Sequence, residues 1–179
     1  MRFRTTPLPG CVLLETEVHA DDRGFFCRLS SEAELREAGL GSVAAETSLS
    51  YNRRRSTLRG LHFQRPPHEE RKLVRCLRGS IFDVAVDLRP GSPSHMAWTS
   101  AILTAENRLA LFVPPGVAHG FLTLEDDTEV LYQISPPYHP DSAGGIRWDD
   151  PRLAIEWPAP PEVVSDRDRS LPLLADLQN

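Results

Sequence analysis

The chain has 179 residues, of which 40% are hydrophobic and 25% charged, a composition typical of a globular protein rather than a disordered one. A chain of this length usually forms one domain and buries roughly 70% of its unfolded surface, so we expect a single domain over residues 1–179. The balance of 20 basic against 25 acidic residues gives a net charge of −5, which argues against a generic nucleic-acid binder.

No segment of the sequence has the length that a membrane helix needs. Purely apolar runs have only a few residues, as at 109–113, whereas a membrane helix needs about 20. Residues 1–7 carry charges but no apolar run follows them, so we expect no secretory signal. The three cysteines are scattered and odd in number, which favours free thiols in a reducing cytoplasm over disulfides.

Short strands separated by turns dominate the pattern. Sixteen prolines and eleven glycines divide the chain into segments, several of which alternate apolar and polar residues. The clearest alternation is in residues 81–88, where Asp83 and Asp87 lie on the face opposite to the apolar side chains. In chain order, we predict strands over 10–18, 24–29, 56–64, 71–77, 81–88, 97–103, 110–113, 119–124 and 128–134.

Helix is scarce in this sequence. Ser31 and Glu34 have the spacing of a capping box, which predicts a short helix that ends before Gly39. A second short helix is predicted near residues 167–177. Strands of this number and spacing predict an all-β fold, a jelly-roll barrel with short peripheral helices, and we find no linker that divides the chain.

Two segments carry residues suited to binding or catalysis. Residues 59–64 read Arg-Gly-Leu-His-Phe-Gln, and residues 114–119 have the Pro-x-Gly-x-x-His pattern of cupin barrels. A metal-binding cupin carries a second histidine where this chain has Gln64, and the loss of that ligand makes a metal site the weaker hypothesis. The ligands that remain for a divalent ion are His62, Glu69 and His119.

Ordered motifs run through most of the chain, at 22–26, 58–64, 72–75, 82–89, 92–93, 114–121, 132, 148–151, 155–158 and 165–168. In these motifs the sequence resembles the dTDP-4-dehydrorhamnose 3,5-epimerases, enzymes of deoxysugar nucleotide biosynthesis. The resemblance implies a cupin-type jelly roll, a nucleotide-diphosphate sugar as substrate and a homodimer. It implies neither a metal nor an organic cofactor.

The resemblance also implies roles in proton transfer. A ketone at C4 of the sugar acidifies C3 and C5, so inversion needs a base, an acid on the opposite face and a donor to the enolate oxygen. His62 matches the base, because imidazole accepts a proton near neutral pH, and Asp168 matches the carboxylate that orients it. Tyr132 matches the acid and Lys72 the oxyanion donor. Asp166, in the same charged run, is the rival of Asp168.

Further residues are expected to bind the substrate. Arg23 and Arg59 match the arginines that hold the diphosphate, for which the paired N–H groups of a guanidinium are suited. Tyr138 matches the aromatic ring that stacks on the nucleotide base. The remaining expected contacts are Phe26, Gln64, His119 and Arg167.

The main expectation is conversion of dTDP-4-keto-6-deoxyglucose to dTDP-4-keto-rhamnose, but three departures leave the details open. Arg28 and Ala143 stand where many members have glutamate, and before the strand that carries His62, where many members have Gln-x-Asn, residues 47–52 read Thr-Ser-Leu-Ser-Tyr-Asn. These positions contact the nucleotide sugar in the family. The alternatives are an epimerase that inverts C3 or C5 alone, a GDP- or CDP-linked 4-keto sugar as substrate, and a non-catalytic or metal-binding cupin.

Overall fold

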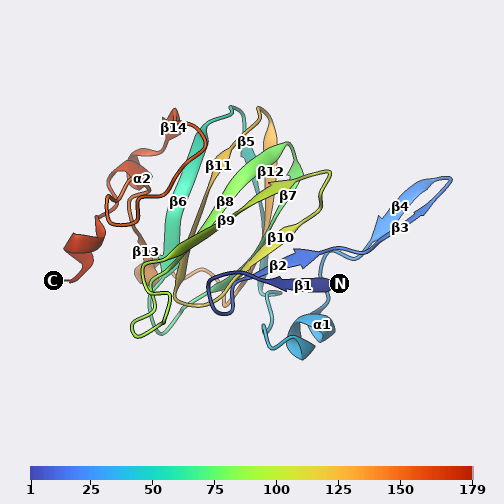
Figure 1. The fold of residues 1–179 in the computed structure, drawn as a ribbon, viewed down its shortest axis with the longest axis horizontal. Helices are drawn as coiled ribbons and strands as arrows, with labels where there is room; N and C mark the ends of the chain where they lie inside the picture. Colours follow the sequence, from blue (N-terminus) through green and yellow to red (C-terminus); the bar gives the residue numbers. More distant parts are fainter. Residues whose placement is uncertain (179) are drawn as a thin grey trace.

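The computed structural model describes residues 1–178, and two β-sheets that face each other form its barrel (Figure 1). Sheet 1 has the order β1, β2, β10, β7, β12 and β5, with the bounds Arg2–Thr5, Val12–Glu15, Ala110–Val113, Arg71–Arg78, Thr128–Ser135 and Glu46–Asn52. Sheet 2 has the order β13, β6, β11, β8 and β9, with the bounds Ala143–Gly145, Thr57–Gln64, Val117–Thr123, Ser80–Asp87 and Trp98–Thr104. The short strand β14 (Val163–Val164) pairs with β6 in the parallel direction, whereas the other strand pairs within the described residues are antiparallel.

Three apolar clusters hold these layers, because side chains along a strand point alternately to its two faces. The cluster between the sheets draws on strands of both, and its members include Val74, Val130, Ala85 and Phe121. The outer face of sheet 1 packs against α1 (Glu32–Glu37), whose Leu35 is buried. The outer face of sheet 2 is covered by the C-terminal segment, from which Ile146 and Leu153 are buried.

The predicted all-β jelly roll with short helices is confirmed. Ser31 caps α1 with its side chain, as the capping box predicted. The helix predicted over 167–177 is wrong in extent, since only α2 (Asp166–Arg169) and a 3-10 turn, η2 (Leu174–Gln178), form there. Pro172 lies between the two and lacks the N–H that a continuous helix would need. No helix within residues 1–178 is long and apolar enough to cross a membrane.

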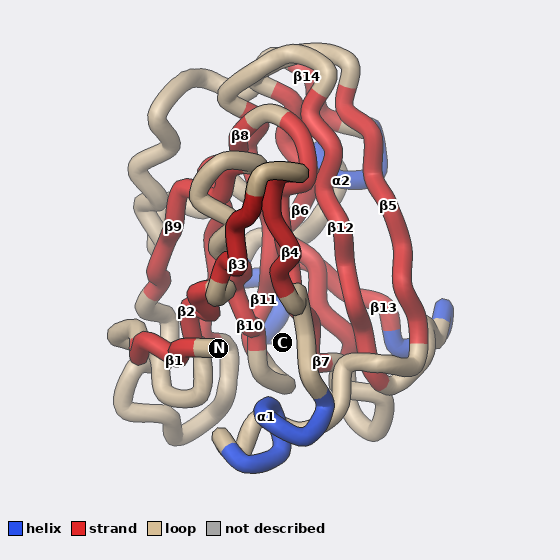
Figure 2. The backbone as a smooth tube through the Cα atoms, turned by 90° about the vertical axis from the view of Figure 1, so that its right-hand side faces the viewer, coloured by secondary structure: helices blue, strands red, loops and turns tan. Residues whose placement is uncertain are grey.

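The strands β3 (Val18–Asp21) and β4 (Gly24–Cys27) form a hairpin that pairs with neither sheet. Figure 1 shows this hairpin extending away from the barrel, and Figure 2 shows it from the side on which it projects. Arg75 holds both of its stems, since one Nη donates to the carbonyl of Leu29 at 2.9 Å and the other to Oγ1 of Thr16 at 3.1 Å. The hairpin is therefore anchored at its base by Arg75, and the guanidinium of Arg108 also lies over the Phe25 ring, 4.3 Å from its centroid.

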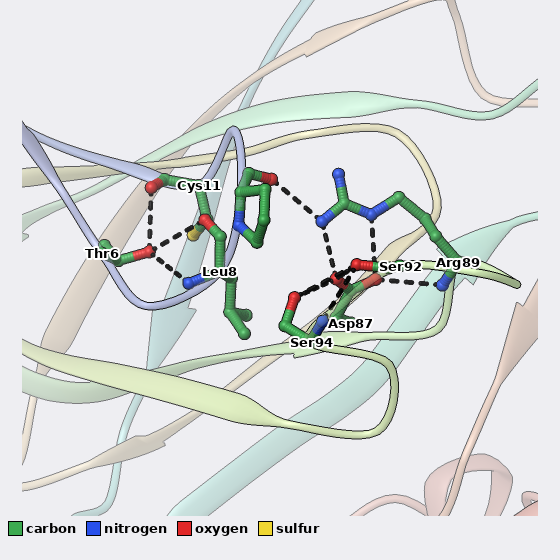
Figure 3. A network of polar contacts seen from close by, with 8 residues as sticks. Thr6, Leu8, Cys11, Asp87, Arg89, Ser92 and Ser94 are labelled. Atoms are coloured by element: carbon green, nitrogen blue, oxygen red, sulfur yellow. Dashed lines mark hydrogen bonds and ion pairs between the residues drawn. The ribbon is translucent and has the colours of Figure 1, made fainter.

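The two aspartates of β8 lie on the same side of the strand, as the alternation predicted, but that side is buried. Asp83 and Asp87 have no exposed surface. The Asp87 carboxylate accepts hydrogen bonds from Nε of Arg89 at 2.8 Å and from the hydroxyls of Ser92 and Ser94 at 2.6 Å each (Figure 3). These contacts fix the turn after β8, and Asp83 is left to face the interior of the barrel.

Glycine lets β6 and β11 approach closely where the predicted catalytic residues lie. A Cβ on Gly60 would lie 2.6 Å from the Cα of Gly120, and Gly60 has a φ of +129°. Side chains at these positions would push the strands apart. The close pairing places His62 directly opposite His119 in the register of the sheet.

Candidate active site

A pocket of about 370 Å³ opens among β5, β6, β7, β11, β12 and the C-terminal segment. The predicted proton-transfer residues all line it: His62, Lys72, Tyr132 and Asp168. Most of the predicted binding residues line it too: Arg59, Gln64, His119, Tyr138 and Arg167. Side chains that are far apart in the sequence therefore converge on one cavity, which we call the barrel pocket.

His62 and Asp168 form a hydrogen-bonded pair, with 2.7 Å between Nε2 of the ring and Oδ1 of the carboxylate. The other carboxylate oxygen accepts the N–H of Gly60 at 3.2 Å, and the Asp168 N–H donates to Oγ of Ser165, which caps α2. Asp168 is buried, whereas its rival Asp166 is exposed. Among the two predicted carboxylates, the structure thus brings Asp168 to the histidine.

The environment of Asp168 keeps it ionised. Burial alone would raise the pKa of this carboxyl, but the hydrogen bonds from His62, Gly60 and Ser165 outweigh burial and hold the pKa below its usual value. A carboxylate only accepts hydrogen bonds, so Nε2 of the neutral His62 ring carries the proton and Nδ1 keeps its lone pair. The pair therefore supplies a base whose free nitrogen is Nδ1.

Tyr132 comes from β12 in sheet 1, on the barrel wall opposite β6. Its ring meets the ring of His119 edge-on, with 6.0 Å between centroids and 83° between planes. Burial raises the pKa of the Tyr132 hydroxyl, and the nearby Asp83 carboxylate raises it further. The residue is consequently a neutral phenol at physiological pH and holds a proton to donate.

His119 does not stand alone in the barrel pocket. Its Nε2 lies 2.7 Å from Oδ1 of Asp83, and both side chains are buried. The sequence reasoning gave Asp83 no role at the site, although the alternation along β8 was the signal that separated this side chain from its apolar neighbours. A second imidazole–carboxylate pair thus lies beside Tyr132.

Lys72 is buried in the barrel pocket rather than solvated as a strand lysine would be. Its Nζ lies 2.8 Å from Oε1 of Glu70 and donates to the carbonyl oxygen of His62 at 3.4 Å. Glu70 also lines the pocket, and sequence reasoning missed it. An ammonium group is therefore held next to the strand that carries the base.

Gln64 connects two loops at the edge of the barrel pocket. Its Nε2 donates to the carbonyl of His68 at 3.0 Å, and its Oε1 accepts the N–H of His139 at 2.5 Å. The rings of these two histidines stack with 3.5 Å between centroids. Through these contacts Gln64 positions the loop that carries the half-exposed Tyr138, and its side chain also lines the pocket.

Two arginines contribute positive charge to the lining. Nε of Arg59 donates to Oδ1 of Asn52 at 2.7 Å, which fixes the guanidinium, and Arg167 joins it from α2. Both side chains are exposed, so they lie where a charged ligand enters from solvent. The mouth of the pocket suits an anionic group such as a diphosphate.

Arg23 and Phe26, both predicted to contact the substrate, do not line the barrel pocket of their own chain. Both lie on the β3–β4 hairpin, where Arg23 pairs with Asp21 at 2.5 Å and Phe26 is 69% exposed. The reason is topological, since the hairpin leaves the barrel instead of folding over its mouth (Figure 1). Motif spacing alone does not say in which direction a hairpin projects.

Comparison with known proteins decides the family. The family model described as dTDP-4-dehydrorhamnose 3,5-epimerase matches residues 5–176. The chain belongs to this family. The dTDP-4-dehydrorhamnose 3,5-epimerase of Methanothermobacter thermautotrophicus is 44% identical over 172 residues, which cover 94% of this chain and 92% of that protein. Both the epimerase class and the cupin-type barrel predicted from the motifs are confirmed.

Solved structures of the epimerase family share the whole fold. The Bacillus anthracis dTDP-4-dehydrorhamnose 3,5-epimerase, with TDP and PPi bound, has a TM-score of 0.93 and 40% identity and covers 97% of this chain and 99% of its own. The Legionella pneumophila enzyme in complex with dTDP-4-keto-L-rhamnose has a TM-score of 0.90 and 35% identity, covering 97% and 93%. Similarity at this level extends over both sheets and the C-terminal segment.

The alternative of a metal-binding cupin gains no support from the side chains of this epimerase. Glu69, the carboxylate proposed to join His62 and His119, does not line the barrel pocket that both histidines line. Within residues 1–178, no group of three or more His, Cys, Asp or Glu side chains has an arrangement that would hold a metal ion. The proposed ligand set is therefore not assembled.

Proposed function

We propose that the barrel pocket inverts C5 and C3 of dTDP-4-keto-6-deoxyglucose and yields dTDP-4-keto-rhamnose. The observation that carries the proposal is the placement of His62 and Tyr132 on opposite sheets of the barrel, one a base paired with an ionised carboxylate and the other a protonated phenol. Removal of a proton from one face and its return to the other is what an inversion of a carbon centre requires.

The first step breaks the C–H bond next to the C4 ketone. Nδ1 of His62 takes the proton, and the electron pair of the C–H bond forms the enolate double bond, which places a negative charge on the C4 oxygen. Asp168 stabilises the imidazolium that results, because its carboxylate lies 2.7 Å from Nε2. The ammonium of Lys72 supplies a hydrogen bond to the enolate oxygen.

The second step returns a proton to the opposite face. The Tyr132 hydroxyl donates to the enolate carbon, and solvent restores both the phenol and the neutral imidazole. No electrons leave the sugar overall, so the chemistry requires no redox cofactor, and on this proposal the Lys72 ammonium stabilises the enolate. A ring flip about an anchored diphosphate would bring the second carbon to the same pair of groups.

Binding of the nucleotide is assigned to the rim of the barrel pocket. Arg59 and Arg167 are proposed to contact the diphosphate, since guanidinium groups match phosphate oxygens in pairs. The Tyr138 ring, 51% exposed on its loop, is proposed to stack on the thymine base. The TDP bound to the Bacillus anthracis enzyme supports a thymidine nucleotide for this chain as well.

We also propose a homodimer in which the β3–β4 hairpin of each chain reaches the barrel pocket of the other. The hairpin carries Arg23 and Phe26, which match substrate contacts of the family but lie outside their own pocket. Its apolar side chains Phe25 and Phe26 are 54% and 69% exposed, which a partner surface would cover. Leu49 of the edge strand β5, beside the pocket, is 57% exposed and offers such a surface.

Two further expectations complete the proposal. We place the enzyme in the cytoplasm, with no nucleic-acid partner, because its three cysteines are all free thiols and its net charge is negative. We treat the chain as one functional domain, because both sheets and the C-terminal segment contribute to the lining of the pocket.

Deuterium exchange followed by NMR tests the proposed function. The wild-type protein is incubated in deuterium oxide with dTDP-4-keto-6-deoxyglucose and, separately, with the GDP- and CDP-linked 4-keto sugars. The account predicts loss of the ring proton signals at both C3 and C5 of the dTDP sugar and little exchange with the others. Exchange at one carbon alone would make the chain a mono-epimerase, and no exchange with any sugar would refute an epimerase function.

A further inference from the structure

The carboxylate of Glu70 is unusual in the barrel pocket, which is built to accept an anionic nucleotide sugar. Glu70 immediately precedes β7, lines the pocket and is buried. Its neighbour Glu69 is half-buried, lies outside the pocket lining and approaches Gly116 instead. The two adjacent carboxylates are thus directed to different places, and of the two only Glu70 lines the pocket.

The partner of Glu70 explains why a carboxylate is present. Its Oε1 lies 2.8 Å from Nζ of Lys72, and the two side chains are only 9% and 8% exposed. A buried ammonium group is strongly unfavourable without a counter-ion, and the four-carbon stem of lysine is flexible. The carboxylate supplies the counter-ion and one fixed point for the ammonium, and the resulting pair adds no net charge to the pocket.

The remaining hydrogen-bond donors of Lys72 are few. An ammonium has three N–H groups, of which one meets Glu70 and another points to the carbonyl of His62 at 3.4 Å. Because both contacts are made with the protein, the third N–H is restricted in direction. It is the group left for the oxygen of a ligand next to His62.

From this geometry we propose that Glu70 is a positioning residue for the epimerase reaction, which holds the Lys72 ammonium and directs it at the enolate oxygen. The inference rests on the proposed function, because it assigns Glu70 to the step in which negative charge develops on the C4 oxygen. Glu70 touches Lys72 and not the reacting carbons, so its influence on turnover passes through the lysine.

The test compares Glu70→Gln with the matched control Glu69→Gln, which removes the same charge one residue earlier. Glu70→Gln keeps the volume and an acceptor oxygen but loses the negative charge. It should lower kcat for C3 and C5 exchange by roughly tenfold or more, since support of the oxyanion is needed mainly in the transition state. The KM for the sugar and the affinity for dTDP alone, measured by calorimetry, should stay within about twofold of wild type. Glu69→Gln should match wild type in all three.

A double-mutant cycle with Lys72→Met separates a role through the lysine from an independent one. In the Lys72→Met background, Glu70→Gln should cause no further fall in the exchange rate. Exchange in this background is slow, so the rate is measured from deuterium incorporation over hours. An equal further loss in that background, or wild-type kcat in Glu70→Gln, would overturn the proposal.

Folding controls and the activity of the wild type complete the design. A Glu70→Gln variant that fails to fold would also overturn the proposal, because it would show a structural role. Glu70→Asp keeps the charge with a shorter reach and should recover part of the lost kcat. Failure of the wild type itself to exchange C3 or C5 protons would instead refute the proposed function, whatever the variants do.

Discussion

The charged groups of the barrel pocket are arranged in pairs at the scale of single residues. Asp168 contacts His62 at 2.7 Å, and Glu70 contacts Lys72 at 2.8 Å, so each carboxylate has a cationic or titratable partner. The guanidinium of Arg59 is instead held by the neutral Asn52 and keeps its full positive charge for a ligand. On our proposal, different side chains bind the anion at the mouth and transfer protons inside.

Arg59 provides the clearest test of that division. Arg59→Ala should raise the KM for the nucleotide sugar roughly 10- to 100-fold, because charge-assisted hydrogen bonds worth about 1.5–3 kcal/mol are lost in ground and transition states alike. Steady-state kinetics should show kcat nearly unchanged. Arg59→Lys should recover little, since an ammonium cannot reproduce paired guanidinium contacts. The exposed Arg55→Ala serves as the control, and a fall in kcat at constant KM would show that the division of roles is wrong.

At the scale of elements, the turn after β8 depends on one buried carboxylate. Burial alone would raise the pKa of Asp87, but hydrogen bonds from Arg89, Ser92 and Ser94 hold it well below its usual value (Figure 3). Because the pKa is lowered by folding, the stabilisation is complete above the unfolded value of about 3.9 and is lost as the pH falls through the folded value. The network should therefore stabilise the fold at neutral pH and lose this effect in acid.

Asp87→Asn measures that effect. At pH 7 the variant should lose about 3 kcal/mol of unfolding free energy, as for a broken buried ion pair. The difference from wild type should shrink by about 1 kcal/mol between pH 4 and pH 3, as the unfolded-state carboxyl becomes protonated. Urea unfolding followed by circular dichroism checks both values, with the exposed Asp22→Asn as control. A difference that stays constant between pH 7 and pH 3 would contradict this account of Asp87.

Elements with strong period-two alternation were predictable, and others were not. The strand β8 follows the sequence pattern, because its apolar face packs in the cluster that the C-terminal segment covers. The edge strand β5 (Glu46–Asn52) was missed, since its alternation is short and its two large side chains, Leu49 and Tyr51, are exposed rather than packed in the core. Alternation also fails to say that a polar face lies inside a barrel, which is why Asp83 went unassigned.

The candidate site was predictable where family motifs name a residue and unpredictable where partners come from elsewhere in the chain. His62 and Asp168 were both named, although only folding of the C-terminal segment beside β6 brings them together. Glu70 belongs to no motif that carried the prediction, and its contact with Lys72 depends on side-chain direction. The position of Arg23 outside its own pocket is set by the projecting hairpin and, on our proposal, by a second chain.

Mixed dimers test the arrangement of the whole molecule. A chain with His62→Asn has no base, and a chain with Arg23→Ala has a weakened phosphate contact. If each hairpin serves the partner's pocket, the mixed dimer contains one pocket with both an intact His62 and an intact Arg23. Dimers purified through two different affinity tags should then show a KM near wild type and about half the wild-type kcat per dimer.

The same experiment has a clear contrary outcome. A mixed dimer that keeps the raised KM of the Arg23→Ala homodimer would place the hairpin in its own pocket. A wild-type chain that sediments as a monomer at assay concentration would remove the homodimer altogether.

The central claim is that His62 and Tyr132 act on opposite faces of the sugar, and Tyr132→Phe in deuterium oxide tests it most directly. Without the phenol, His62 can still remove a proton and, after exchange with solvent, return deuterium to the same face. NMR should therefore show continued deuterium incorporation into the starting sugar while the inverted product falls by roughly 10²–10⁴-fold, and His62→Asn should lose both. Inversion at the wild-type rate in Tyr132→Phe, or undiminished exchange in His62→Asn, would contradict the account.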